Sequence, residues 1–159
     1  MDEHVDAAKV KFFPPGIPLI VIAVGIGLNS LCPLSFGIEI GVPARYFIGG
    51  AFAICAFVFL GVWAVVLFRK NGQNENPWKT TPYIESRGPF RVTRNPMYLQ
   101  MVLVCIGVAF ATANWWILLL TPVGAWALQE LAIKPEEKYL EDKFGDTFLE
   151  YKRKVRRWL

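Results

Sequence analysis

The sequence predicts an all-α integral membrane protein with about four transmembrane helices and cytosolic amphipathic helices at its C-terminal end. Of the 159 residues 54% are hydrophobic, yet the chain also carries 17 basic and 13 acidic side chains. These charges are segregated, because residues 17–33, 46–68, 97–113 and 115–133 contain none apart from Glu130. A run of about 17 to 25 apolar residues can cross the hydrocarbon core of a bilayer. We therefore expect one membrane domain over residues 1–159.

The distribution of Lys and Arg predicts the orientation of these spans. Sixteen of the 17 basic residues fall in the N-terminal arm, the loop at 69–96 and the segment after residue 133, and only Arg45 falls on the other side. Basic residues accumulate on the cytoplasmic side of membrane proteins. Both termini and the loop at 69–96 are thus predicted to be cytosolic. The net charge of +4 then reflects topology and contact with anionic membrane lipids, and we expect no nucleic-acid partner.

The first two spans have recognisable ends. Pro14 and Pro15 precede the first span, where proline suits the start of a helix. Its leader mixes acidic and basic residues and no small-residue cleavage site follows, so we interpret it as a retained anchor. The second span ends at Arg69 and Lys70, and the Asn- and Gly-rich segment after it breaks the helix.

The last two spans form a hairpin with a small polar tip around Asn114. Pro122 predicts a kink in the final span, because proline removes a backbone hydrogen bond. Pro135 is favoured at the first position of a helix and disfavours helical geometry in the residue before it. We therefore expect a break at this point and a new cytosolic helix from residue 135.

Two further helical segments are expected over 135–158. Gly145 is predicted to end the first of them and Asp146 to cap the second. Apolar residues then recur at steps of three and four, which places them on one helix face. With basic residues at the other positions, the segment is typical of an amphipathic helix at a membrane surface. These apolar residues are Phe144, Phe148, Tyr151, Val155 and Trp158.

The hairpin would bring two polar clusters to the same membrane face. Residues 94–98 precede the third span and Glu136-Glu137 follow the fourth, and a chain that crosses and returns ends on the side it left. Each cluster has an ordinary explanation: acidic residues stabilise the first turn of a helix, and Arg, Pro and Tyr are common at a membrane boundary. Together, an Arg fork and a carboxylate pair could bind a zwitterion.

No metal site is expected. Cys32, Cys55 and Cys105 lie within or at the ends of apolar segments and show no metal-like spacing. They are interpreted as small apolar side chains in the packing.

In order, the two clusters and the segments around them resemble the isoprenylcysteine carboxyl methyltransferase and phospholipid methyltransferase superfamily, over about residues 78–159. The matching positions are Gly88-Pro89-Phe90-Arg91-Val92-x-Arg94-Asn95-Pro96-Met97-Tyr98 and Pro135-Glu136-Glu137-x-x-Leu140-x-x-x-Phe144-Gly145-x-x-Phe148-x-x-Tyr151. The resemblance implies an integral membrane enzyme that binds S-adenosylmethionine at the cytosolic ends of its last spans.

Carried over by position, the resemblance implies a cofactor pocket with two walls. Arg94, Asn95, Pro96 and Tyr98 would form one wall, and the Glu136-Glu137 pair the other. The family usually has His where this chain has Asn95. Asn can still donate and accept hydrogen bonds, but any titrating role of that His is lost.

The acceptor is expected to be a lipophilic or amphiphilic molecule, such as an isoprenylcysteine carboxylate or a lipid. The first half of the chain should help to shape its pocket. A carboxylate acceptor needs no general base, whereas a thiol, amine or hydroxyl can need one. Glu130 is the candidate base, because an intramembrane carboxylate marks a function or a buried partner by default; otherwise it is a Glu near the interface that snorkels or is protonated.

Two alternatives stay open at this point. A membrane reductase of the sterol-reductase type would use NADPH and needs extra basic residues for the 2′-phosphate, and this chain looks short for it. The other alternative is a non-catalytic membrane scaffold of the same fold, to which the Asn95 departure gives some support.

Overall fold

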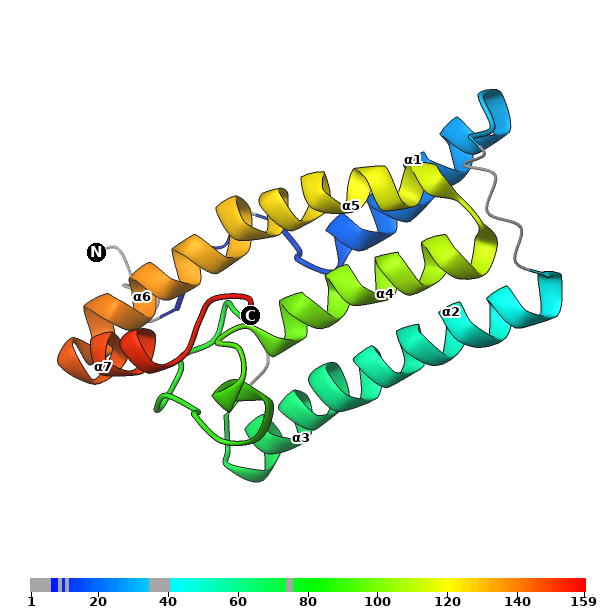
Figure 1. The fold of residues 1–159 in the computed structure, drawn as a ribbon. Coiled ribbons are helices and arrows are strands. Elements are labelled where there is room, and N and C mark those ends of the chain that lie inside the picture. Colours follow the sequence, from blue (N-terminus) through cyan, green and yellow to red (C-terminus); the bar gives the residue numbers. More distant parts are fainter. Residues whose placement is uncertain (1–6, 9, 11, 35–40, 74–75) are drawn as a thin grey trace.

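The computed structural model describes residues 7–8, 10, 12–34, 41–73 and 76–159. Within this part every regular element is a helix, and there is no strand (Figure 1). The helices are α1 (Gly16–Leu31), α2 (Val42–Ala56), η1 (Phe57–Val62), α3 (Trp63–Lys70), η2 (Gly88–Arg91), α4 (Pro96–Thr112), α5 (Trp115–Leu128), η3 (Gln129–Ile133), α6 (Lys134–Phe144) and α7 (Asp146–Lys154).

Several of these elements join end to end. The segments α2, η1 and α3 form one helix of 29 residues, Val42–Lys70, and α5, η3 and α6 form one of 30 residues, Trp115–Phe144. Both are long and apolar enough to cross a membrane, whereas α1 and α4 are shorter apolar helices. At 1.5 Å per residue the second long helix extends about 45 Å. It therefore exceeds a hydrocarbon core of about 30 Å.

Large apolar side chains cover the outside of the bundle. Phe47 of α2 is 79% exposed and Trp126 of α5 is 64% exposed. An exposed apolar surface of this kind marks contact with a partner or with lipid. The all-helical class is thus confirmed, and the composition of the long helices fits a membrane protein.

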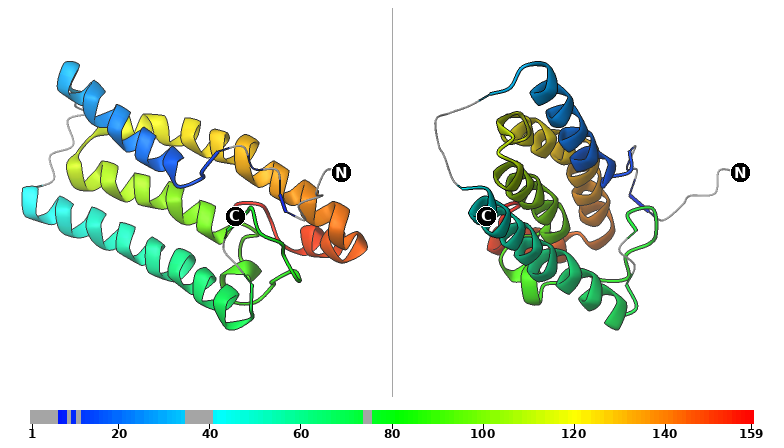
Figure 2. Two further views of the ribbon diagram at one scale, coloured as in Figure 1. Left: turned by 180° about the vertical axis from the view of Figure 1, so that it is seen from behind. Right: turned by 90° about the vertical axis from the view of Figure 1, so that its right-hand side faces the viewer.

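Helix α4 lies in the middle of the bundle, between α2 on one side and α1 with α5 on the other (Figures 1 and 2). Its contact with α2 is close enough to require glycine. A Cβ atom on Gly49 would come within 2.6 Å of the Gly107 carbonyl oxygen and 2.5 Å of the Ala111 nitrogen. Small residues allow such close backbone approach between membrane helices.

The break predicted at Pro135 is wrong. Ile133 and Lys134 have helical dihedral angles, and the helix runs through Pro135 to Phe144. The five residues before Lys134 form a π-helical segment. The wider π turn changes the hydrogen-bond ladder where the proline lacks a donor. The polar end of α6 is therefore held rigidly on the last apolar helix.

The end of the chain also differs from the prediction. Helix α7 stops at Lys154, and Val155 is extended, so the amphipathic helix does not reach residue 158. Gly145 ends α6 as predicted, with a φ of +51° that favours glycine. Asp146 does not cap α7, because it is already the first helical residue and no side chain caps that end.

Candidate functional site

Helices α6 and α7 and the loop after α3 gather at one end of the bundle (Figure 1). Their side chains and those at the start of α4 line a pocket. Counted together with the open solvent at its mouth, the space is about 850 Å³. All six residues predicted for the cofactor line it, namely Arg94, Asn95, Pro96, Tyr98, Glu136 and Glu137. The hairpin of α4 and α5 therefore brings the two clusters together, although about forty residues separate them.

Glu136 is the carboxylate of the pair that is left for a ligand. The Tyr98 hydroxyl donates a hydrogen bond to Glu136 Oε1. Within the described residues no Lys or Arg pairs with Glu136. Tyr98 itself is 7% exposed, so it holds the carboxylate from the buried side. Burial raises the pKa of Glu136 to about 7, so the site offers a buried carboxyl group without a neutralising cation.

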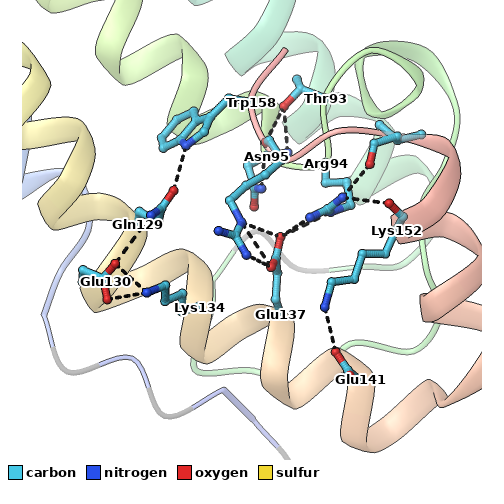
Figure 3. Close-up of polar contacts among 12 residues, drawn as sticks. Thr93, Arg94, Asn95, Gln129, Glu130, Lys134, Glu137, Glu141, Lys152 and Trp158 are labelled. Carbon is cyan, nitrogen blue, oxygen red and sulfur yellow. Dashed lines mark hydrogen bonds and ion pairs between the residues drawn. The ribbon is translucent and has the colours of Figure 1, made fainter.

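Glu137 is neutralised by two guanidinium groups (Figure 3). Arg94 Nη2 lies 2.8 Å from Glu137 Oε1, and Arg157 Nη2 lies 2.6 Å from Glu137 Oε2. The side chains of Glu137 and Arg94 are 8% and 7% exposed. The hydrogen bond to Glu137 raises the pKa of the Arg157 guanidinium. Two of the predicted ligand-binding groups therefore pair with each other.

Backbone oxygens of the C-terminal tail, residues 155–159, accept hydrogen bonds from the segment before α4. Thr93 Oγ1 and Asn95 Nδ2 donate to the Arg157 oxygen at 2.9 and 3.0 Å, and the Arg94 N–H donates to the Arg156 oxygen at 2.9 Å. Trp158 Nε1 donates to Gln129 Oε1 at 3.1 Å. The tail therefore packs against the segment before α4, and Asn95, which lines the pocket, helps to hold it there. These contacts need the tail extended, which explains why α7 ends early.

The loop between α3 and α4 forms the other side of the pocket. Glu85 is 5% exposed and accepts hydrogen bonds from Arg87 Nε and Nη2, both at 2.8 Å, and from Asn71 Nδ2 at 3.0 Å. The Arg87 guanidinium lowers the pKa of the Glu85 carboxyl, against the effect of burial. Phe68 and Phe90 also line the pocket, and their rings stack with centres 5.0 Å apart. No motif or periodic pattern in the sequence points to Glu85.

Glu130, the predicted general base, lies elsewhere. It is not among the residues that line the pocket, and it pairs with Lys134 at 2.7 Å one turn along the helix (Figure 3). Its side chain is 31% exposed. A catalytic role for Glu130 stays a prediction, and the position gives it no support.

A family model named phospholipid methyltransferase matches residues 44–147, which extend from within α2 to the first residues of α7 and include the six predicted residues. This chain belongs to the phospholipid methyltransferase family. The superfamily predicted from the two clusters is thus confirmed, and the match extends further toward the N-terminus than those motifs. The members of this family are membrane methyltransferases.

One relative gives a second comparison. An uncharacterized protein of Haemophilus influenzae is 38% identical over 63 residues, which are 40% of this chain and all of the relative. No solved structure matches this member of the phospholipid methyltransferase family.

Proposed function

We propose that the protein transfers a methyl group from S-adenosylmethionine to a lipophilic or amphiphilic acceptor at the cytosolic face of a membrane. The charge of the pocket is the observation that carries this proposal. Among the described residues that line it, three are carboxylates and one is a cation. Glu85 pairs with Arg87, and Glu137 pairs with Arg94 and Arg157. Glu136 is therefore the carboxyl group of the pocket that no cation neutralises within the described residues.

This balance favours a cationic ligand over a polyanionic one. S-adenosylmethionine has a sulfonium and an ammonium group, whereas NADPH has several phosphates that would need basic partners. An unpaired carboxylate in a partly desolvated site attracts a cation more strongly than it would in water. Glu136 is therefore the proposed partner of the cofactor's ammonium group.

The remaining residues fit the rest of the cofactor. Phe68, Tyr83 and Phe90 give aromatic surface at the loop side of the pocket, which suits an adenine ring. The Asn95 and Tyr98 side chains hold the walls through the contacts described above.

When bound, the cofactor would supply a methyl group that its sulfonium already activates. The protein then has to hold the acceptor in line with that methyl and exclude water. The extended tail, joined to Glu137 through Arg157, is proposed to hold the pocket wall of Arg94 and Glu137 in place.

The acceptor is proposed to enter from the bilayer. In this arrangement α1, the helix Val42–Lys70, α4 and the apolar part of the helix Trp115–Phe144 are four spans, both termini are cytosolic, and the pocket lies at the cytosolic ends. A hydrophobic substrate could approach between the helices without leaving the membrane.

Binding of radiolabelled S-adenosylmethionine and of NADPH to the detergent-purified protein tests this function. We expect saturable binding of the first, which unlabelled S-adenosylhomocysteine displaces, and none of the second. Saturable binding of NADPH alone would indicate a reductase, and binding of neither would indicate a scaffold. Either result would refute the proposed function.

A further inference from the structure

Gln73 has a buried acceptor without a partner. The residue follows α3, is 7% exposed and lines the pocket. Its backbone N–H donates to the Phe68 oxygen at 2.8 Å, and its side-chain Nε2 donates to the Tyr83 oxygen at 3.1 Å. Gln73 Oε1 is buried, and within the described part of the chain it has no hydrogen-bond partner.

The orientation of this amide is defined by its contact. The Tyr83 carbonyl can only accept a hydrogen bond, so the NH₂ group of Gln73 has to face it. The oxygen then lies on the other side of the amide. A flipped side chain would set two oxygens against each other and would not remove the unpaired acceptor.

An unpaired acceptor in this position is costly. Buried side-chain polar groups almost always have a partner, and leaving one unsatisfied costs about 1–3 kcal/mol. A ligand donor that reaches Gln73 from the pocket would remove this cost.

The surroundings define the kind of donor. Gln73 shares its part of the pocket with Phe68, Tyr83 and Phe90, and the nearby Glu85 is already paired with Arg87. An uncharged amide oxygen beside aromatic surface suits the N–H of a neutral heterocycle. An ammonium group would instead favour the carboxyl group of Glu136, which has no other cationic partner within the described residues.

We propose that Gln73 determines the specificity for the base of the cofactor, with Oε1 accepting a hydrogen bond from the 6-amino group of adenine. This inference rests on the proposed function, because it assumes that an S-adenosyl compound occupies the pocket. Gln73 would then reject a base that has an oxygen at the same position, since two acceptors would face each other.

A pair of ligands and a pair of variants test the inference. The ligands are S-adenosylhomocysteine and its 6-oxo counterpart, S-inosylhomocysteine, and their affinities are measured by calorimetry on purified full-length protein. Gln73→Met retains the length of the side chain and removes the acceptor. Gln100→Met, on α4 and outside the residues that line the pocket, is the matched control. Gln73→Asn withdraws the oxygen by one methylene and serves if Gln73→Met does not fold.

We expect wild type and Gln100→Met to prefer the amino compound by about tenfold or more, which corresponds to about 1.4 kcal/mol. In Gln73→Met or Gln73→Asn this preference should fall to within about twofold, mainly through weaker binding of the amino compound. Wild-type protein that binds both ligands equally would overturn the role of Gln73 and leave the proposed function intact. A folded Gln73 variant with the full preference would do the same. Wild-type protein that binds neither ligand would overturn the proposed function, and this inference with it.

Discussion

Arg157 Nη2 lies 2.6 Å from Glu137 Oε2 and so joins the last residues of the chain to the first turn of α6. Glu137 also binds Arg94, which lies just before α4. One carboxylate therefore connects three segments that are distant in the sequence. The tail, the hairpin and the pocket wall are therefore joined through the two ion pairs of Glu137.

Removal of the tail's charge should loosen the tail. We expect Arg157→Met to destabilise the protein by about 1–3 kcal/mol, because Glu137 loses one of its two partners. Limited proteolysis and thermal unfolding in detergent measure the effect. Lys154→Met is the control, since the Lys154 side chain is 75% exposed and its partner Glu150 is 67% exposed and 3.9 Å away. Equal stability of the two variants would show that the ion pair at Glu137 does not hold the tail.

The stability of the loop should depend on pH through Glu85. Its folded pKa lies below the ordinary value of 4.5 because of Arg87. The charged form is thus the one that stabilises the fold, and its contribution is full above the ordinary pKa and is lost as the pH falls through the lower, folded pKa. We expect wild type to melt above Glu85→Gln at pH 7 and the difference to shrink below about pH 4.5. A difference that grows in acid would contradict this sign.

Membrane orientation is testable by cysteine labelling. In a background without Cys32, Cys55 and Cys105, impermeant reagents should label Lys79→Cys and Glu150→Cys only from the cytosolic side, and Gly41→Cys only from the other side. The positive-inside rule and the arrangement of the helices predict this pattern. Labelling of positions 79 and 150 from opposite sides would be incompatible with the pocket, which contains residues next to both.

The acceptor should be recognised by its apolar part. We expect turnover to rise along a homologous series of acceptors, because each buried methylene contributes about 0.8 kcal/mol. Glu130→Gln should change turnover by less than about twofold, since its carboxylate pairs with Lys134 outside the pocket. A large loss of turnover in Glu130→Gln, with unchanged cofactor affinity, would support Glu130 as the general base. Best activity with a small water-soluble acceptor would refute entry from the bilayer.

The apolar helices were predictable because hydropathy is a local signal. α5 begins at Trp115, where the last apolar run begins, but its helix continues without a break to Phe144. Residue preferences did not predict that the helix continues through Pro135, because it continues by way of a π-helical segment at Gln129–Ile133. The hairpin correctly predicted that the two clusters lie close together. It did not predict which residues pair, because Arg157 of the tail binds Glu137 together with Arg94. Gln73 and Glu85 line the pocket because of the conformation of the loop between α3 and α4, which no periodic pattern in the sequence predicts.

The two neighbouring carboxylates should now behave differently. Glu137→Gln should mainly lower stability, because a buried carboxylate paired with two guanidinium groups is lost; breaking such pairs costs about 3–5 kcal/mol. Glu136→Gln should mainly lower cofactor affinity. The control is Glu141→Gln, because Glu141 lies on the same helix, is 43% exposed and does not line the pocket.

Calorimetric titration of S-adenosylmethionine into wild type and Glu136→Gln therefore tests the central claim most directly. We predict an affinity that falls about tenfold or more in Glu136→Gln, or about 1.4 kcal/mol, with an unchanged melting temperature and no change in Glu141→Gln. Equal affinity in wild type and a folded Glu136→Gln would contradict the claim that this pocket binds the cofactor through Glu136.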